Sequence, residues 1–488
     1  MKYGKTIHFR LVFKLLGMLL MVLSAAMILS LGWARYYNEQ EVIRPILISI
    51  FLTLLSGLIL FFSNKSYDHR NISIKEGYLI VTFTWLSMSA LGALPYFISG
   101  TTTCYADAFF ESMSGFTTTG ASILHDIESV PKSLLFWRST THWLGGMGII
   151  VLTLAILPIL GVGGMQLFVA EVPGSTPVKL HPHMRETAKR LWGIYLLFTI
   201  AQSLLLMLGG MDFFHSINHA FSTMATGGFS TQNDSIAGYS AYIQYVIIFF
   251  MILAGISFAL HYLLLKGEFR RVLANEELRF YFSVIGIFTM ILTTGILILH
   301  QTGFEESFRQ ALFQTVAITT TTGFVTTDYL QWNHFLWFLI FLLMFTGGCI
   351  GSTGGGIKMI RVLVLIKNTG LELKRLIHPM AIIPVRIDKK TIPKEIITNF
   401  LAFFLLYILI FFAGAAIMSA YGLDFGSAMG ASIATIGNIG PAIGSVGPTE
   451  NYAHIPEGGK WVLSFFMLLG RLELFTVLLL FSPSFWKK

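Results

Sequence analysis

The chain has 488 residues, of which 54% are hydrophobic and only 12% are charged. Soluble proteins carry about 25% charged residues, so this composition excludes an ordinary soluble domain. The formal net charge is +8, which taken alone would suit a nucleic-acid-binding protein.

Apolar stretches long enough to cross a bilayer recur along the whole chain. They predict an all-α, polytopic membrane protein with ten transmembrane spans. The first, from Leu11 to Trp33, is too long for the apolar core of a cleavable signal peptide and lacks a small-residue cleavage site. The predicted spans lie near residues 11–33, 45–63, 77–98, 135–160, 191–210, 242–265, 280–300, 335–366, 395–420 and 461–482.

The basic residues follow the predicted topology. Ten spans place both termini on one side, and 24 of the 33 Lys and Arg residues fall on that side, with 6 on the other. This asymmetry predicts cytoplasmic termini and explains the net charge without nucleic acid. The basic loop 367–394 is equally suited to docking a partner or an acidic membrane lipid.

Four short segments rich in threonine and glycine repeat along the chain. Each follows a helix-compatible stretch of about ten residues, too short to span a bilayer, and each has one full span before it and one after it. The segments are FFESMSGFTTTGAS (109–122), INHAFSTMATGGFS (217–230), ALFQTVAITTTTGF (311–324) and SAMGASIATIGNIGP (427–441). Aligned on one glycine, they match at Gly120, Gly227, Gly323 and Gly437. The predicted units are two accessory spans (1–76) and four repeats (77–160, 187–267, 278–366 and 394–488).

The repeated unit predicts an ion filter. Non-helical backbone at membrane depth must face protein or a water-filled cavity. Four copies can surround an axis, where carbonyl and threonine hydroxyl oxygens replace the water around a monovalent cation. Glycine allows the required backbone angles, and the C-terminal ends of four short helices favour a cation. A single such turn would be an ordinary re-entrant turn; the fourfold repetition favours the filter.

Acidic residues flank the short stretches. Asp107 and Glu111 either concentrate cations at the outer mouth or interact with the start of the first short helix; capping is the preferred role for Asp107. Asp212 and Asp424 open the second and fourth short stretches in the same way, so capping is the shared expectation.

The span 335–366 contains a glycine-rich interruption. Glycine costs about 1 kcal/mol per helical position relative to alanine, so a continuous helix is disfavoured. Close helix packing is one alternative, and a phosphate-binding loop is a weaker one because the spacing of its motif is absent. We expect a flexible intramembrane loop that gates the pore. Its residues are Gly347, Gly348, Gly351, Ser352, Thr353, Gly354, Gly355 and Gly356.

Arg471 lies near the middle of the last predicted span. A cation at that depth costs at least roughly 2.5–3.5 kcal/mol, so it should face a partner or water. An ion pair with Glu473 is one alternative, but a residue two positions on points to a different helix face. The preferred role is a positive barrier in the pore below the filter.

Several motifs together resemble the TrkH branch of the TrkH/TrkG/KtrB potassium-uptake superfamily. They are TTTGAS (117–122), GGFS (227–230), TTGF (321–324), GNIGP (437–441), GGCIGSTGGGIKMIR (347–361) and GRLELFT (470–476). The resemblance runs the length of the chain and includes the two extra leading spans. It implies four pseudo-fourfold repeats of span, pore helix and span around one pore, assembled as a homodimer in the bacterial inner membrane.

The same resemblance implies K⁺ uptake and a cytoplasmic, nucleotide-binding regulator of the TrkA type. Any nucleotide is expected on that partner, and no cofactor is expected on this chain. Carried over by position, the filter segments are Thr117–Ala121, Ala225–Gly228, Thr320–Phe324 and Thr435–Ile439. The filter residues within them are Thr117, Thr118, Thr119, Gly120, Ala225, Thr226, Gly227, Thr320, Thr321, Thr322, Gly323, Thr435, Ile436, Gly437 and Asn438.

Two other classes of function compete with a gated pore. A K⁺/H⁺ or K⁺/Na⁺ symporter would work by alternating access, but such carriers favour inverted halves and buried carboxylates. An enzyme is not expected, because the sequence lacks a nucleophile–base set, an HExxH motif, a metal-ligand cluster and a Walker motif.

Overall fold

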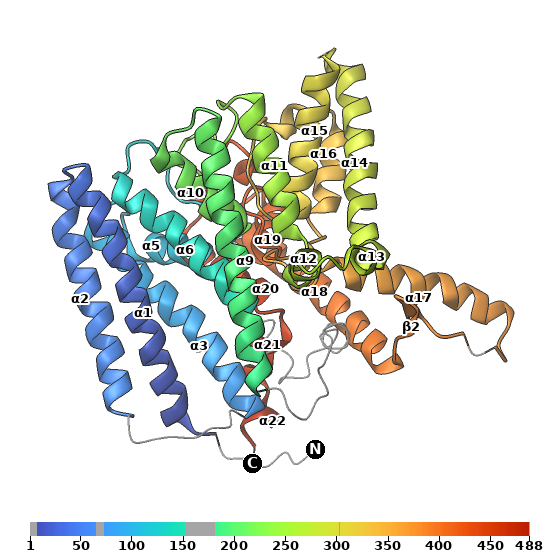
Figure 1. The fold of residues 1–488 in the computed structure, drawn as a ribbon, viewed down its shortest axis with the longest axis horizontal. Helices are drawn as coiled ribbons and strands as arrows, with labels where there is room; N and C mark the ends of the chain where they lie inside the picture. Colours follow the sequence, from blue (N-terminus) through green and yellow to red (C-terminus); the bar gives the residue numbers. More distant parts are fainter. Residues whose placement is uncertain (1–6, 65–72, 152–180, 302, 382, 488) are drawn as a thin grey trace.

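The computed structural model describes residues 7–64, 73–151, 181–301, 303–381 and 383–487 (Figure 1). Within these ranges the regular secondary structure is helical apart from one hairpin of two short strands and an isolated bridge between Thr346 and Ile357. The predicted all-α class is therefore confirmed.

The first two helices form an antiparallel pair at the edge of the molecule (Figure 1). They are α1 (Phe9–Tyr36) and α2 (Gln40–Phe62). Their backbones touch where Gly17 faces Gly57: a Cβ on Gly17 would lie 2.7 Å from the carbonyl oxygen of Gly57. This close crossing depends on both glycines, because any side chain would push the helices apart.

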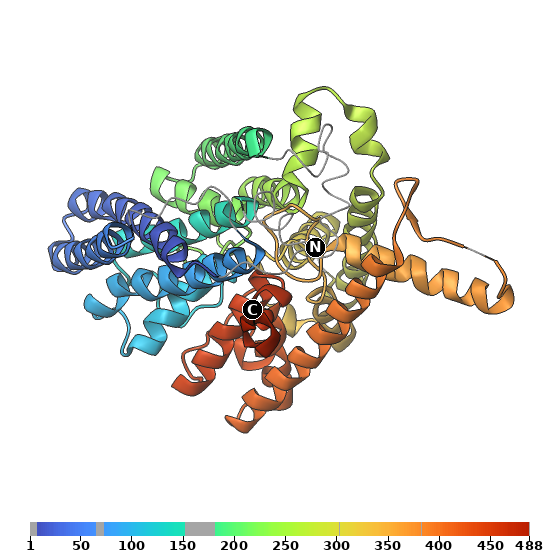
Figure 2. The same cartoon turned by 90° about the horizontal axis from the view of Figure 1, so that it is seen from below.

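The rest of the chain repeats one order of elements: a long helix, a helix of 12 or 16 residues, and a returning helix. Figure 2 shows the four groups around a common centre, with α1 and α2 outside them. The first group is α3 (Ile74–Gly92), α4 (Leu94–Ile98), α5 (Tyr105–Phe116) and α6 (Lys132–Val151); the second is α9 (His181–Leu208), α10 (Phe213–Met224), α11 (Ala241–Gly255) and α12 (Phe258–Leu265). The third is α13 (Phe269–Ala274), α14 (Glu276–His300), α15 (Phe304–Thr319), α16 (His334–Leu343) and α17 (Met359–Ile377); the fourth is α18 (Lys394–Ala420), α19 (Phe425–Ile436), α20 (Glu457–Arg471), α21 (Phe475–Leu478) and α22 (Pro483–Trp486). Short 3₁₀ turns lie at Tyr329–Gln331, Gly444–Val446 and Leu479–Phe481.

Three of the returning helices are broken. Helices α11 and α12 meet at 100°, and α20 meets the α21 segment at 111°. The sequence predicted spans at 242–265 and 461–482 and gave no break in either, and the structure divides each between two helices. The breaks arise where Ile256 takes an extended conformation and where Leu474 has a positive φ of 50°. The predicted interruption of span 335–366 is confirmed, because α16 ends at Leu343 and α17 begins at Met359.

The number of spans stays a prediction. Six described helices are long and apolar enough to cross a membrane, or up to eight if each bent pair is one span. The predicted span 135–160 continues past the end of α6 into residues outside the described ranges, and span 335–366 is divided between two helices.

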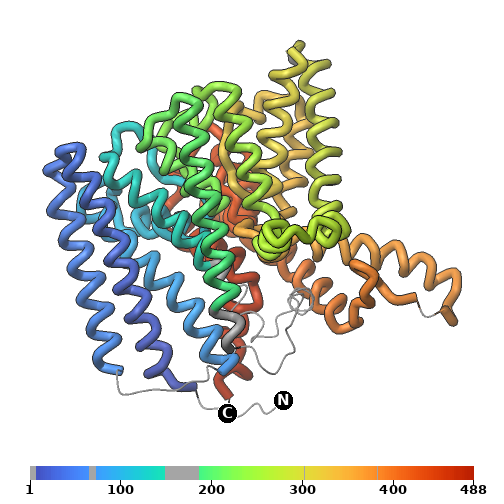
Figure 3. Tube along the Cα trace, viewed as in Figure 1, coloured from blue at the N-terminus to red at the C-terminus, as the bar shows by residue number. Residues whose placement is uncertain are grey.

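Helix α17 and the hairpin after it project from the side of the molecule as an arm (Figure 3). Strand β1 (Arg386–Ile387) pairs antiparallel with β2 (Lys390–Thr391). The turn residues Asp388 and Lys389 both have positive φ, as a two-residue hairpin turn requires. From here on, "the arm" means residues 359–394.

Candidate functional site

The four short helices all end in the same way. In each, the residue after the helix is still right-handed, the next is left-handed, and a glycine two positions later again has positive φ. The left-handed residues are Thr118, Thr226, Thr321 and Asn438, with φ of 51°, 55°, 58° and 54°; the glycines are Gly120, Gly228, Gly323 and Gly440, with φ of 81°, 80°, 75° and 96°. This geometric repeat defines four turn segments: 117–120, 225–228, 320–323 and 437–440.

The geometry corrects the alignment made from the sequence. The equivalents of Gly120 are Gly228 and Gly440, so matching it to Gly227 and Gly437 displaced the second segment by one residue and the fourth by three. Thr435 and Ile436 precede the fourth turn segment, in the last turn of α19, where the Thr435 hydroxyl donates to the carbonyl of Ala431 (2.7 Å). Letter matching failed in the second segment because two glycines, Gly227 and Gly228, are adjacent, and in the fourth because asparagine replaces threonine at the left-handed position.

The four turn segments touch one another in cyclic order. A side chain on the positive-φ glycine of each segment would strike a carbonyl oxygen of the next: Gly120 against Gly227, Gly228 against Thr322, Gly323 against Ile439, and Gly440 against Thr119, the last at 2.7 Å. Contact from first to second, second to third, third to fourth and fourth to first closes a ring. We call this ring the turn ring.

Several threonine hydroxyls of the turn ring bond to protein. Thr117 and Thr119 share a hydrogen bond of 2.8 Å, as do Thr320 and Thr322. Thr117 also donates to the carbonyl of Met113 (2.6 Å). These hydroxyls therefore anchor the turns to their helices. That they also bind an ion together with the carbonyls stays a prediction.

The backbone carbonyls at the middle of each turn segment are buried and have no protein donor. Within the described ranges, no N–H or O–H group hydrogen-bonds to the carbonyl oxygens of Thr118, Thr119, Thr226, Gly227, Thr321, Thr322, Asn438 and Ile439. Buried carbonyls are nearly always paired, so a cluster of unpaired ones from four converging segments is suited to a ligand that accepts several oxygens at once. A dehydrated monovalent cation is such a ligand.

A buried ion pair between Arg138 and Glu111 supports the turn ring from the surrounding helices. Arg138 on α6 pairs with Glu111 on α5 (2.6 Å) and donates to the carbonyl of Ser230 (2.9 Å), just after the second turn segment. Glu111 also accepts from the backbone N–H of Ile123 (3.0 Å). Because Glu111 is fully buried, its suggested role in concentrating cations at the outer mouth is wrong.

The other acidic residues have structural partners as well. Asp107 lies within the first turn of α5, whose N-cap residue is Cys104 and which has no side-chain cap, so its preferred role as a cap is wrong. It pairs with Lys460 on α20 at 2.5 Å and joins the first and fourth groups. Asp212 and Asp424 cap α10 and α19 by accepting from the backbone N–H of His215 and Ser427, as expected. The hydrogen bonds from Ser427 hold the pKa of the Asp424 carboxyl below its usual value.

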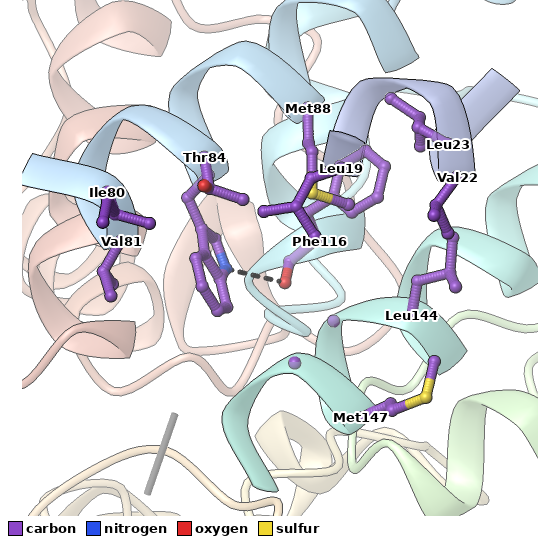
Figure 4. A pocket seen from close by; sticks show the side chains of 13 residues that line it. Leu19, Val22, Leu23, Ile80, Val81, Thr84, Met88, Phe116, Leu144 and Met147 are labelled. Atoms are coloured by element: carbon purple, nitrogen blue, oxygen red, sulfur yellow. Dashed lines mark hydrogen bonds between the residues drawn. The ribbon is translucent and has the colours of Figure 1, made fainter. Parts of the chain in front are cut away.

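Two side chains, Trp85 and Asn438, also stabilise the turn ring by hydrogen bonds. The Trp85 indole of α3 donates to the carbonyl of Phe116, the last residue of α5 (3.2 Å; Figure 4). The Asn438 amide donates to the Thr119 hydroxyl (2.9 Å) and to the carbonyl of Met467 (2.9 Å), bridging the fourth segment to the first. Sequence reasoning missed Trp85, because its partner is a backbone atom far along the chain.

The glycine-rich break between α16 and α17 lies against the turn ring. We call residues 344–358 the glycine loop. The N–H of Gly355 donates to the Thr321 hydroxyl (2.6 Å), and the Thr353 hydroxyl donates to the carbonyl of Met224 (3.0 Å). A Cβ on Gly355 would lie 2.6 Å from the carbonyl oxygen of Gly437. The loop thus contacts three of the four turn segments or the helices that lead into them.

Arg471 lies across this loop and is only 2% exposed. Its guanidinium donates to the carbonyl of Thr353 (2.6 Å) and to the carbonyl of Gly145 on α6 (3.3 Å). It does not pair with Glu473, whose carboxylate binds Arg361 instead. Lys358 is also buried and donates to the carbonyl of Gly354 within the loop.

The chain is similar to known proteins over nearly its whole length. The family model described as TrkH, a cation transport protein, matches residues 43–488. The Trk system potassium uptake protein TrkH of Salmonella typhimurium is 40% identical over 487 residues, which is 99% of this chain and 100% of the relative. The Trk system potassium uptake protein TrkG of Escherichia coli strain K12 is 32% identical, covering 99% of each chain.

A solved structure matches as well. The crystal structure of the potassium transporter TrkH from Vibrio parahaemolyticus aligns with a TM-score of 0.90 at 37% identity and covers 99% of this chain and 100% of that chain. The aligned part of the chain therefore includes the residues of all four groups of helices, of the four turn segments and of the glycine loop.

Proposed function

Because the chain belongs to the TrkH family of cation transport proteins, we propose that it carries K⁺ into the bacterial cell through the turn ring. The relatives are named as potassium uptake proteins, which favours a transporter over an enzyme. The observation that supports the proposal most is the set of buried, unpaired carbonyl oxygens contributed by four turn segments. Such oxygens substitute for the hydration shell of K⁺, and the C-terminal ends of four short helices add negative potential.

We propose that the glycine loop and Arg471 form the closed gate. The loop lies against the turn ring through Gly355 and Thr353, so an ion leaving the ring meets its backbone. The Arg471 charge sits close by, with no carboxylate in salt-bridge range among the described residues. An uncompensated positive charge in a site of low dielectric repels a passing cation strongly.

We propose further that the protein works as a homodimer in the inner membrane, surrounded by lipid, with cytoplasmic termini and a TrkA-like regulator below it. The arm is the best candidate for the docking surface of that regulator. It carries exposed apolar side chains at Leu376, Ile377 and Met380, which are 77%, 73% and 96% exposed, beside several lysines and arginines. Exposed apolar patches of this kind mark interaction surfaces.

A symporter coupled to H⁺ or Na⁺ is the second candidate. The sharp breaks between α11 and α12 and between α20 and α21 favour it, because broken helices at membrane depth are common in carriers. Three carboxylates argue against it, because each is held by a basic residue: Glu111 pairs with Arg138, Glu473 with Arg361 and Asp107 with Lys460. A proton-coupled site would need a carboxylate able to change its protonation state.

The test is ⁸⁶Rb⁺ uptake into K⁺-loaded proteoliposomes that hold this protein alone, with competition by K⁺, Na⁺ and Li⁺. We expect uptake that K⁺ blocks and Li⁺ does not. If the gate is closed without the regulator, wild-type uptake will be low and Arg471→Ala will raise it at least fivefold. Arg35→Ala, which removes an exposed charge far from the pore, is the control.

The outcomes separate the candidates. Uptake that saturates and requires a proton gradient would favour the symporter. Absence of uptake from both the wild type and Arg471→Ala, with both proteins folded, would contradict the pore. Equal uptake by the wild type and Arg471→Ala would leave the filter in place and remove the role of Arg471 as a barrier.

A further inference from the structure

A carboxylate on α14 hydrogen-bonds to the backbone of the glycine loop. Glu277, the second residue of that helix, is 5% exposed. Its Oε1 atom accepts the backbone N–H of Ile350 (2.8 Å) and that of Ile360 (3.1 Å). Ile350 lies in the glycine loop and Ile360 in the first turn of α17, so one oxygen joins the loop to the helix that follows it.

These two bonds are of the strong, charge-assisted kind. A carboxylate bound to backbone N–H groups makes hydrogen bonds roughly twice as strong as neutral ones. Helix α17 begins at Met359 and has no side-chain cap from its own N-cap residue, Lys358. Glu277 therefore acts as a cap donated by another helix, where a negative charge is favourable.

Around Ile350, the neighbouring loop residues make neutral backbone bonds to the broken α11–α12 region. Cys349 N–H donates to the carbonyl of Gly255 (2.8 Å), and Phe258 N–H donates to the carbonyl of Gly351 (3.1 Å). Within the described ranges, Glu277 is the one carboxylate that hydrogen-bonds to residues 344–358. Losing it would free Ile350 and Ile360 from α14, while the contacts of Arg471 and Lys358 with the later part of the loop, at Thr353 and Gly354, would remain.

The residues just before Glu277 connect it to the arm. The hairpin turn residue Asp388 accepts from the backbone N–H of Glu276 (2.8 Å) and from the Asn275 amide (3.2 Å). Lys367 of α17 bonds to the Glu276 carboxylate and to the carbonyl of Arg386 (3.0 Å). Moving the hairpin therefore pulls on the first turn of α14, where Glu277 is the next residue.

We propose that Glu277 is a positioning residue that latches the glycine loop against the turn ring and connects the latch to the arm. A shift of the hairpin moves the first turn of α14, withdraws the carboxylate from Ile350 and Ile360, and releases the loop. The latch itself is a property of the loop and can be measured without ion flux; only its effect on transport rests on the proposed function.

The chain contains a reporter for this movement. Cys349 lies in the glycine loop next to Ile350 and is fully buried, and the other cysteine, Cys104, is replaced by serine for the experiment. The measurement is the rate at which a small, water-soluble methanethiosulfonate reagent modifies Cys349 in the full-length protein in lipid nanodiscs. We expect slow modification in the parent and at least a tenfold faster rate in Glu277→Ala.

Two further variants make the result specific. Glu277→Gln keeps a carbonyl oxygen at the same place, so its rate should stay within about threefold of the parent. Glu395→Ala removes another glutamate from the first turn of a long helix, but this side chain is exposed and distant from the loop, so its rate should equal that of the parent. Asp388→Ala should raise the rate of Cys349 modification at least threefold, because it removes the hydrogen bonds between the arm and the first turn of α14.

A rate in Glu277→Ala equal to that of the parent, with a native elution profile, overturns the latch. If Glu277→Ala does not fold, Asp388→Ala decides, and an unchanged rate there overturns the connection to the arm. Faster modification with unchanged ⁸⁶Rb⁺ uptake supports the latch and removes the glycine loop from gating. The labelling rate therefore tests the latch, and the ⁸⁶Rb⁺ uptake tests the proposed pore independently of it.

Discussion

At the scale of single residues, the turn ring is built from backbone conformations that its side chains resist. Thr118, Thr226 and Thr321 are β-branched and yet left-handed, a combination that is rare and costs of order 1–3 kcal/mol each. Thr321 gains a contact from it, since its hydroxyl accepts the N–H of Gly355. Strain of this kind, repeated in three of the four segments, is typical of a functional site.

Gly323 offers the sharpest test at this scale. It combines a φ of 75° with a neighbour that leaves no room, because a Cβ would strike the carbonyl oxygen of Ile439 and lie 2.9 Å from Cδ of Pro441. We expect Gly323→Ala to reduce ⁸⁶Rb⁺ uptake at least tenfold in a protein that still folds. The displaced carbonyl belongs to the fourth segment, so the contact between the third and fourth segments of the turn ring would be lost.

Gly100→Ala is the matched control for that variant. Gly100 has the same φ of 75°, but nothing lies within 4 Å of an added Cβ. It therefore carries the cost of left-handed backbone, about 1–2 kcal/mol, without the collision. We expect its uptake to stay within twofold of the wild type. Equal uptake by the two variants would show that contact between the third and fourth segments is not required.

At the scale of elements, the sequence predicted what depends on local pattern. The helical class, the four short helices and the interruption of span 335–366 follow from apolar length and from glycine content, and the structure confirms them. The break between α20 and α21 follows Gly470, but the residues with positive φ are Glu473 and Leu474, whose residue types do not favour that conformation. The partners of Glu111 and Glu277 are 27 and 73 residues away along the chain, and only the fold reveals them.

The fourth turn segment shows a signal that was present and misread. Asparagine tolerates the left-handed region better than other residues that carry a side chain. Asn438 therefore marks the left-handed position, and Gly440, two residues later, is the counterpart of Gly120. An alignment based on backbone preference in place of shared letters would have found the register.

The crossing of α1 and α2 allows a prediction that separates stability from transport. Gly17→Leu would force the two helices apart, because a Cβ already lies 2.7 Å from the carbonyl oxygen of Gly57. Overpacking of this kind costs about 1–3 kcal/mol. We expect a lower midpoint of thermal unfolding in detergent, with ⁸⁶Rb⁺ uptake per folded molecule unchanged, since neither helix contributes to the turn ring.

Gly32→Leu is the control on the same helix, because nothing lies within 4 Å of a Cβ at that position. Its midpoint should match that of the wild type. A loss of uptake per folded molecule in Gly17→Leu, absent from Gly32→Leu, would instead show that the accessory pair supports the pore.

At the scale of the whole molecule, the contacts described above form a chain from the arm to the ion pathway. In the arm, Asp388 accepts a hydrogen bond from the first turn of α14. Glu277, in that same turn, accepts one from the glycine loop. The loop in turn contacts the turn ring through Gly355. Under the proposed function, a regulator bound to the arm would act on the pore without reaching it. Such an arrangement requires that the regulator bind the arm tightly enough to shift it.

The exposed apolar side chains of the arm provide that test. We expect the triple variant Leu376→Ser/Ile377→Ser/Met380→Ser to lose at least tenfold in affinity for a TrkA-like regulator, measured with the purified proteins in detergent. Burying one large apolar side chain contributes about 1.5–3 kcal/mol, so losing three exceeds tenfold even when association costs absorb most of the gain. Uptake without the regulator should stay within twofold, because these residues are distant from the turn ring.

Leu273→Ser is the matched control: this residue of α13 is 68% exposed and lies outside the arm. The regulator should bind that variant as it binds the wild type. Mass photometry of the same samples decides what else the arm does. If the triple variant binds the regulator normally but turns monomeric, the apolar side chains belong to the contact between two copies of the chain. The pull on Asp388 must then come from the partner subunit, and opening one pore would depend on the other.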